Sequence, residues 1–222
     1  MMLNQLSDYI EFAYFLAIFL LSINIYIQTR KMHSFPLHRG IRYFKNAFLY
    51  FSMIYLFRFM VLDLKLVTGI IAPEFEIALR SFGLFLVIYF SLLAIFSLIS
   101  SFSWRKYAFI TDNRLNLLSL FLSCIAFFLK LPSILLIVGF VVALFLLVKA
   151  YDSSRKKNRI FSPLFIIYTL LLFFILFDLV PITQELIPFE FRIAGYVGSI
   201  LVFLYINIKV MKVLGAGKDE EK

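Results

Sequence analysis

Seven long stretches free of charged residues fill this chain, and short charged segments separate them. A helix needs roughly 17 to 25 mostly apolar residues to cross the hydrocarbon core of a bilayer, and most stretches reach that length with their flanks. The second stretch is short because Arg58 interrupts it before Phe59–Leu62 continues it. The charge-free stretches are Phe12–Thr29, Asn46–Phe57, Ser81–Trp104, Leu115–Leu129, Leu131–Val148, Ile160–Phe177 and Ile193–Ile208. The pattern predicts an all-α integral membrane protein with seven transmembrane helices.

The composition agrees with a membrane protein, because 63% of the residues are hydrophobic and only 16% are charged. A soluble domain usually carries about 25% charged residues. Segments such as Phe15–Leu21 are apolar all round, as expected for helices that face lipid or lie fully buried. We therefore expect a single seven-helix membrane domain over residues 1–222. The predicted helices cover about 9–29, 41–64, 76–104, 111–130, 132–151, 160–180 and 190–212.

The basic residues gather in alternate connecting segments and at the C-terminal end of the chain. By the positive-inside rule these segments lie in the cytoplasm, with the N-terminus outside and the C-terminus inside. An odd number of helices requires the same arrangement, which predicts a multi-pass protein of the cell membrane. The residues concerned are Arg30, Lys31, Arg39, Arg42, Lys45, Arg105, Lys106, Arg114, Lys149, Arg155, Lys156, Lys157, Arg159, Lys209, Lys212, Lys218 and Lys222.

The net charge of +9 does not indicate nucleic-acid binding. A nucleic-acid-binding protein gathers its basic residues on one folded face, whereas here they are spread over three segments and a tail at one membrane surface. The expected partners are the lipid bilayer and, at the cytoplasmic segments, anionic lipid headgroups. A cytoplasmic signalling protein or other membrane subunits are further expected partners.

The two ends of the chain resemble each other. Phe59–Leu64 and Phe174–Leu179 both end in Asp-Leu, and the same offset relates two prolines and two glycines, Pro73 with Pro188 and Gly83 with Gly198. These matches predict a 3+1+3 plan of two parallel three-helix repeats joined by a linking helix. The alternative is chance similarity, because apolar segments use few residue types.

A 3+1+3 plan with an external N-terminus resembles, in layout, the seven-helix sugar transporters with Pro-Gln loops and the microbial rhodopsins. The motifs of both groups are missing. The chain contains no Pro-Gln pair, and its predicted helix 190–212 carries lysines only at Lys209 and Lys212, near the cytoplasmic end, rather than midway as retinal binding requires. The layout is also similar to the membrane sensor modules that precede prokaryotic kinase domains.

Charged residues at the predicted outer helix ends form the best candidate for a binding site, because charges inside membrane helices are costly. Arg58 lies deepest and would suit a carboxylate or phosphate. Tyrosines could line the same cavity, namely Tyr55, Tyr89, Tyr168, Tyr196 and Tyr205. The alternative is structural ion pairing, of Arg58 with Asp63 or Asp178 and of Arg80 with Glu76. The candidate ligand-binding residues are Arg58, Asp63, Arg80, Asp178, Glu190 and Arg192.

Signals for catalysis, metals and cofactors are weak. The chain has no His-Glu-x-x-His, Cys-x-x-Cys or Gly-x-Ser-x-Gly motif, and we expect no enzyme activity, no cofactor and no metal site. The one cysteine, Cys124, lies within predicted helix 111–130 and is interpreted as a packing residue. Asn116, Ser119 and Ser123 share one face of that helix and are expected to join it to its neighbours by hydrogen bonds.

Three functions fit these features. The favoured one is a receptor-like or sensory seven-helix module with an outward-facing polar site and a separate cytoplasmic partner. One alternative is a small-solute or ion transporter built from parallel three-helix repeats, which would need a polar site near the middle of the membrane. The other alternative is an accessory subunit of a larger membrane complex.

Overall fold

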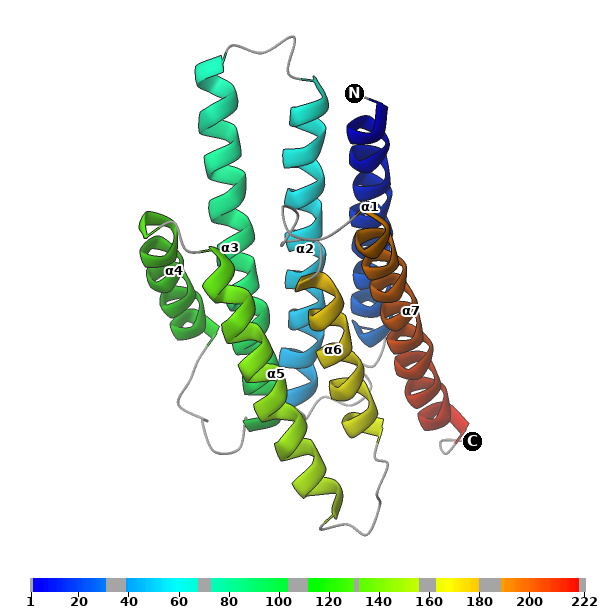
Figure 1. The fold of residues 1–222 in the computed structure, drawn as a ribbon. Coiled ribbons are helices and arrows are strands. Elements are labelled where there is room, and N and C mark those ends of the chain that lie inside the picture. Colours follow the sequence, from blue (N-terminus) through cyan, green and yellow to red (C-terminus); the bar gives the residue numbers. More distant parts are fainter. Residues whose placement is uncertain are drawn as a thin grey trace. The chain divides into compact units, whose positions relative to one another are not determined.

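The computed structural model describes residues 2–30, 39–67, 73–103, 112–129, 132–155, 163–179 and 189–219. Within these ranges every residue is helical except Leu129, which forms a turn, and there is no strand (Figure 1). The prediction of an all-helical chain is therefore confirmed for the described part. The helices are α1 (Met2–Arg30), α2 (Arg39–Val67), α3 (Pro73–Ser103), α4 (Asp112–Phe128), α5 (Pro132–Arg155), α6 (Pro163–Leu179) and α7 (Phe189–Asp219).

Local sequence explains several helix ends. Three helices, α3, α5 and α6, begin with proline, whose fixed φ suits the first helical position and whose missing N–H has no partner there anyway. Asp112 lies in the first turn of α4, and Arg30 and Arg155 lie in the last turns of α1 and α5. Each of these charges complements the helix dipole.

Four helices are long and apolar enough to cross a membrane, over Tyr9–Arg30, Gly40–Leu62, Ile77–Ser101 and Phe191–Lys212. These spans contain 22 to 25 residues, which gives about 33 to 38 Å at the helical rise of about 1.5 Å per residue. The helices α4 and α6 are shorter, at 17 residues each. In α5 the apolar helical segment is Phe140–Lys149. The structure thus supports four spanning helices of the seven that the sequence predicts.

Two observed helices are longer than the predicted ones. α1 begins at Met2 rather than near residue 9, and α7 continues to Asp219 rather than ending near residue 212. The prediction followed the limits of the apolar stretches, whereas helical hydrogen bonding continues into the charged flanks at little cost. The single seven-helix membrane domain over residues 1–222 stays a prediction.

The described chain divides into two compact units. Unit 1 consists of Met1–Ile23 and Arg39–Leu135, and unit 2 consists of Asn24–His38 and Leu136–Lys222. Within unit 1, α2 packs against α3 and α3 against α4, and within unit 2, α6 packs against α7. Helix α1 contributes to both units, because the boundary falls between Ile23 and Asn24.

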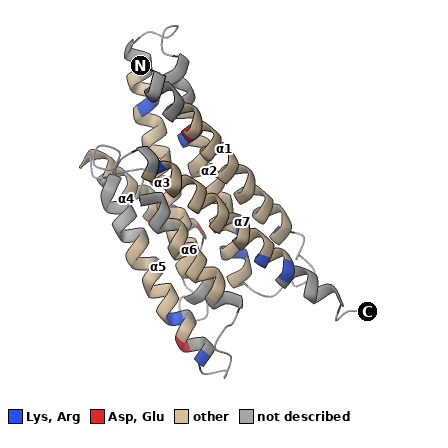
Figure 2. Ribbon diagram, turned by 45° about the vertical axis from the view of Figure 1, so that its right-hand side comes forward, with Lys and Arg blue, Asp and Glu red and all other residues tan. Residues whose placement is uncertain are grey.

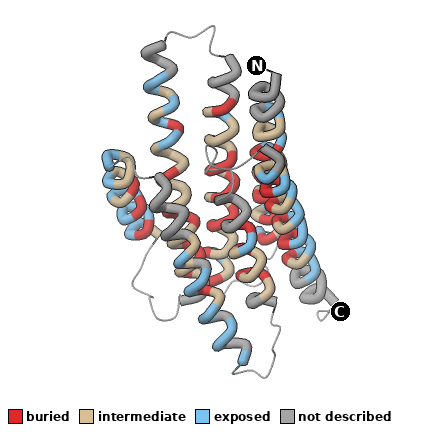
Figure 3. Tube along the Cα trace, in the orientation of Figure 1, coloured by how far each residue is buried: buried red, intermediate tan, exposed pale blue. Residues whose placement is uncertain are grey.

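Buried and exposed positions alternate along the described helices (Figure 3), and the buried positions include small hydroxyl-bearing residues while many large apolar residues are exposed. Helix α4 shows this clearly, because Ser119 and Ser123 are fully buried whereas Phe121 and Phe128 are exposed. Membrane helices pack in this way, since small residues let backbones approach and apolar side chains face lipid. In water, such large exposed apolar surfaces would need a partner. The pattern therefore agrees with membrane embedding.

The prediction for one face of α4 is only partly right. Ser119 and Ser123 are buried as expected, but Asn116 is exposed. Leu115 takes its place in the buried stripe, one position earlier along the chain. The reason is that residues 115, 119 and 123 repeat at intervals of four, which follows the buried side more closely than the interval of three from 116 to 119. Asn116 is also in the early turns of the helix.

Gly83 on α3 lies directly against Val61 on α2. A Cβ atom at this position would overlap the Cγ2 methyl group of Val61. Gly83 is buried and Val61 is half-buried, so a larger residue could be accommodated only if the Val61 side chain rotated or the two helices moved apart. The missing side chain of Gly83 therefore permits close packing against Val61 of α2.

We predict that Gly83→Ala lowers the free energy of unfolding by about 1–3 kcal/mol, as overpacking of a well-packed contact typically does. Val61→Ala removes the methyl group that the new Cβ would meet, so the double variant should recover most of the loss. Thermal unfolding of the four proteins in one detergent, followed by circular dichroism, tests this. Additive effects of the two substitutions would show that Gly83 and Val61 do not pack closely against each other.

Candidate functional site

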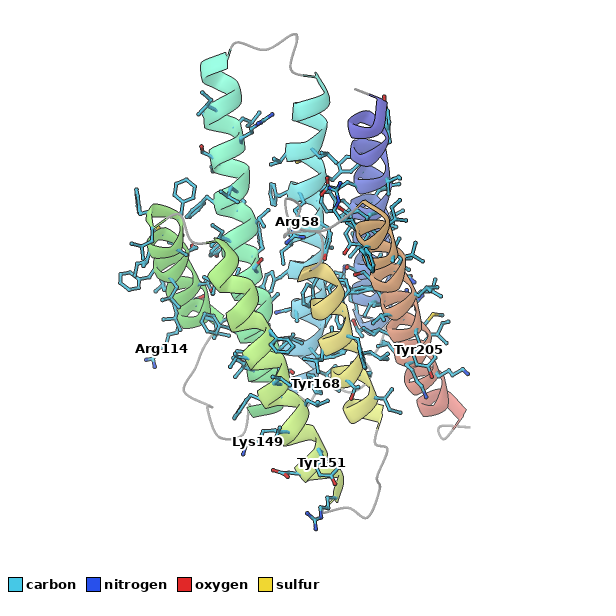
Figure 4. The ribbon with its side chains drawn as sticks, in the orientation of Figure 1. Arg58, Arg114, Lys149, Tyr151, Tyr168 and Tyr205 are labelled. Atoms are coloured by element: carbon cyan, nitrogen blue, oxygen red, sulfur yellow. The ribbon has the colours of Figure 1, made fainter. Side chains whose placement is uncertain are left out.

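Arg58 is half-buried on α2, one turn before the end of the Gly40–Leu62 span (Figure 4). Its guanidinium carbon lies 5.3 Å from the centre of the Tyr55 ring on the same helix and 6.0 Å from the centre of the Phe15 ring on α1. All three residues belong to unit 1. The charged group is thus held against two aromatic rings that come from neighbouring helices.

The aromatic rings beside Arg58 are themselves fixed by packing. Tyr55 is 1% exposed and Tyr14 is 2% exposed, and their hydroxyl oxygens lie 3.5 Å apart. The rings of Tyr14 and Tyr55 meet edge to face with centres 5.9 Å apart, and Phe15 lies 6.1 Å from Tyr55. Three rings from α1 and α2 therefore make a rigid support, which we call the aromatic platform (Tyr14, Phe15 and Tyr55).

The sequence produces this arrangement through helical spacing. Tyr55 and Arg58 are three residues apart and lie on the same face of α2. On α1 the residues Tyr14, Phe15, Ile18, Ser22 and Ile25 form one buried stripe. Nearby, the rings of Phe12 and Phe59 pack with centres 4.3 Å apart, which joins the two helices beside the platform.

This environment allows a permanent positive charge near the end of a membrane span. A cation above an aromatic face gains about 0.5–1 kcal/mol at exposed sites and about 2 kcal/mol when desolvated. The guanidinium carbon lies near both ring centres, and the N–H groups of a guanidinium donate hydrogen bonds in the plane of the group. Contact with the aromatic platform is therefore compatible with binding of a carboxylate or phosphate by the same group.

The structure describes the side chains of only two of the other five predicted ligand-binding residues. Arg80 is exposed on α3 in unit 1, and Arg192 is half-buried on α7 in unit 2. The side chains of Asp63, Asp178 and Glu190 lie outside the described residues, as does that of Glu76, the predicted partner of Arg80. The proposed grouping of the six residues therefore stays a prediction.

The tyrosines predicted to line the site have different surroundings. Tyr55 lies beside Arg58, whereas Tyr205 is exposed on α7, where its ring lies near Lys209. Tyr168 and Tyr196 are buried in unit 2, and Tyr89 is half-buried on α3. The sequence reading missed Tyr14 and Phe15, although the period of the buried stripe on α1 could have identified them.

One ion pair joins two helices at the other end of unit 1. The Arg42 Nη2 and Asp112 Oδ2 atoms lie 2.9 Å apart, and both side chains are about half exposed. Arg42 is in the first turns of α2 and Asp112 opens α4. Exposed pairs of this kind contribute about 0–1 kcal/mol. Their main effect here is to fix the position of the short helix α4.

Among the described residues no group of three or more His, Cys, Asp or Glu side chains could hold a metal ion. Cys124 is half-buried on α4 and carries a free thiol. Neither observation offers catalytic chemistry within the described part of the chain.

Comparison with known proteins gives one relative and no function. A protein of Archaeoglobus fulgidus, described only as an uncharacterized protein, is 29% identical to this chain over 213 residues, which cover 92% of each sequence. No protein-family profile matches the chain. No solved structure matches it either. The similarity extends over nearly the whole length of both chains.

We predict a measurable energetic coupling between Arg58 and the aromatic platform. Tyr55→Leu and Arg58→Gln, made singly and together, should give a coupling free energy of about 0.5–1 kcal/mol, because the double variant has no contact left to lose. Unfolding in detergent provides the measurement. Phe57→Leu is the control partner for Arg58→Gln, since the Phe57 ring stacks on Phe90 of α3 instead. Equal coupling in both cycles would contradict a specific contact.

Proposed function

We propose that this chain is a receptor-like seven-helix protein of the cell membrane that binds an anionic group at Arg58 and acts through a separate cytoplasmic partner. The observation that carries the proposal is the half-buried Arg58 guanidinium on the aromatic platform. A fixed cation at the outer end of a span is a suitable receptor for a carboxylate or phosphate. The proposal assigns the chain no catalytic role.

Seven membrane-embedded helices are part of this proposal. Four helices are long and apolar enough to span, and α4 and α6, with 17 residues each, are at the lower limit of what a bilayer needs. The exposed apolar side chains of α4 and α5, including Phe121, Phe128, Val141 and Phe145, also favour contact with lipid. Basic residues in alternate connecting segments support an external N-terminus and a cytoplasmic C-terminus.

The two-unit division supports the proposed internal repeat. Unit 1 contains the packed pair α2 with α3, to which α4 is added, and unit 2 contains the packed pair α6 with α7. These are the pairs that the repeated sequence features relate. Ile88 on α3 and Phe203 on α7 correspond at the same offset as Gly83 and Gly198, and both are buried. In such a plan, one repeat would bind the ligand and the other would contact the cytoplasmic partner.

We predict that a small organic carboxylate or phosphate raises the melting temperature of the wild-type protein and that Arg58→Gln abolishes this shift. A ligand at a hundred times its Kd stabilises by about 2.7 kcal/mol, which a thermal shift assay in detergent detects readily. Arg58→Lys should keep a reduced shift, because lysine retains the charge but not the bidentate geometry.

The same assay separates binding from a structural role. If Arg58→Gln melts much lower than wild type but still shows the full ligand shift, the guanidinium only stabilises the fold. A ligand shift that all three proteins share would also contradict the proposal. Arg114→Gln is the matched control, since Arg114 is exposed on α4 of the same unit and is not among the candidate ligand-binding residues.

A part-buried amide pair in unit 2 favours the alternative of a small-solute or ion transporter. Asn24 Nδ2 on α1 donates a hydrogen bond of 3.3 Å to Asn207 Oδ1 on α7. Asn207 is buried, and both residues lie within spans, Tyr9–Arg30 and Phe191–Lys212. Polar contacts inside membrane spans mark solute pathways in transporters, and they also join helices by hydrogen bonds.

Flux measurements distinguish these roles of the amide pair. On the transporter alternative, protein in sealed vesicles should move a labelled small solute, and Asn207→Leu should reduce the rate at least tenfold while the protein stays folded. If the amides only join α1 to α7, the expected result is no flux above empty vesicles and a loss of about 0.6 kcal/mol in stability. Leu201→Ala, an exposed position on the same helix, is the control.

A further inference from the structure

The C-terminal ends of α5 and α7 carry the same local feature, an aromatic residue followed four positions later by lysine. The Lys149 Nζ atom lies 5.7 Å from the centre of the Phe145 ring, and the Lys209 Nζ atom lies 6.0 Å from the centre of the Tyr205 ring. Lys149 and Tyr205 are labelled in Figure 4. Both helices belong to unit 2 over these residues. We call these the aromatic–lysine pairs.

The aromatic members are open to the surroundings. Phe145 is 50% exposed and Tyr205 is 46% exposed, while Lys149 is exposed and Lys209 is half-buried. Exposed aliphatic side chains precede or flank both rings, namely Val141, Leu144 and Val148 on α5 and Leu201, Leu204 and Ile208 on α7. Charged residues follow toward the helix ends, Asp152 and Arg155 on α5 and Lys212 on α7 (Figure 2). Each pair therefore marks the change from an apolar to a charged surface.

This change of polarity has the order found at a membrane interface. Four residues correspond to about 6 Å along a helix, so each ring starts about one turn deeper than its lysine. Aromatic rings prefer the boundary between acyl chains and headgroups, and lysine extends its ammonium group toward the phosphates. A phosphate beside such an ammonium is favoured further when the lipid carries a net negative charge.

We propose that the two aromatic–lysine pairs of unit 2 bind the phosphate groups of anionic lipids in the leaflet that faces the basic segments. Lys209 lies within the Phe191–Lys212 span and Lys149 ends the apolar segment Phe140–Lys149. The phosphate of a membrane lipid already lies at the depth of these two lysines. A soluble acidic protein would have to enter the headgroup layer to reach them. Charge complementarity and the neighbouring acyl-facing side chains therefore commit this surface to lipid. The inference does not depend on the Arg58 site.

A third basic residue near an aromatic ring provides a contrast. The Arg42 guanidinium lies 5.6 Å from the Tyr43 ring in unit 1, but it forms the ion pair with Asp112. Its charge is already compensated by a carboxylate, and Tyr43 is buried. This site lacks the exposed ring that the aromatic–lysine pairs offer to lipid, so we do not assign it the same role.

Native mass spectrometry of the purified full chain tests the proposal. The probes are phosphatidylglycerol as the anionic lipid and phosphatidylcholine as the neutral lipid. Inorganic phosphate is the third probe, because it supplies the phosphate group without acyl chains. We expect phosphatidylglycerol to bind in preference to both. The double variant Lys149→Gln with Lys209→Gln should lower its affinity roughly fivefold for each lysine removed.

The matched control removes the same charge from the same predicted side. Arg114→Gln with Lys212→Gln changes two exposed basic residues that have isoleucine four positions earlier, at 110 and 208. This control should keep most of the phosphatidylglycerol affinity. A second test variant, Phe145→Leu with Tyr205→Leu, keeps both charges and should still lower the affinity by about twofold or more.

Four results would overturn the inference. Equal losses in the two charge variants would mean attraction by overall charge, and no loss in either would mean that lipid binds elsewhere. Equal binding of phosphatidylglycerol and phosphatidylcholine would exclude recognition of the anionic group. If the lysine variant kept its lipid but lost a soluble protein that copurifies with wild type, the surface would be a protein-docking site. The Phe145→Leu with Tyr205→Leu variant keeps the test decisive if the lysine variant fails to fold.

Discussion

The hydrogen bonding of the helical backbone is the constraint on which the remaining features depend. Inside a bilayer no water is available to peptide groups, so a chain of such apolar segments must satisfy them within helices. Every described residue except Leu129 is helical, and the Leu129 N–H itself donates a hydrogen bond of 3.0 Å to the Ile125 carbonyl oxygen. Once the backbone hydrogen bonds are formed within the helices, the side chains determine only where the helices contact one another. Small residues such as Gly83, Ser119 and Ser123 occupy the contacts, and large apolar residues are left for the surroundings.

The sequence was most informative where a residue type is rare in its setting. Arg58 stood out because it interrupts an apolar stretch, and the structure gives it a defined aromatic environment. Tyr14 and Phe15, which supply much of that environment, were missed among 29 Phe and 12 Tyr, although they belong to the buried stripe on α1. The Arg42–Asp112 pair also escaped the sequence reading, because nothing local relates residues on α2 and α4.

The helix prediction differed from the structure for a related reason. Apolar stretches report which segments avoid water, but turns between short helices can be equally apolar, as Leu129 at the end of α4 shows. The apolar stretches predicted seven spanning helices, whereas length and composition support four in the described chain. Asn116 shows that the sequence pattern also fails to fix which face of a helix is buried. The buried stripe of α4 runs one residue earlier than predicted, so Asn116 is exposed.

The shared helix α1 has a consequence for the synthesis of the chain. Asn24 lies in the part of α1 that belongs to unit 2, and its partner Asn207 is 183 residues further along. At typical elongation rates of about 5–20 residues per second, α1 waits on the order of ten to forty seconds for this partner. Its N-terminal portion finds α2 much sooner. Unit 1 can therefore form during translation, while completion of unit 2 depends on the last helix to be made.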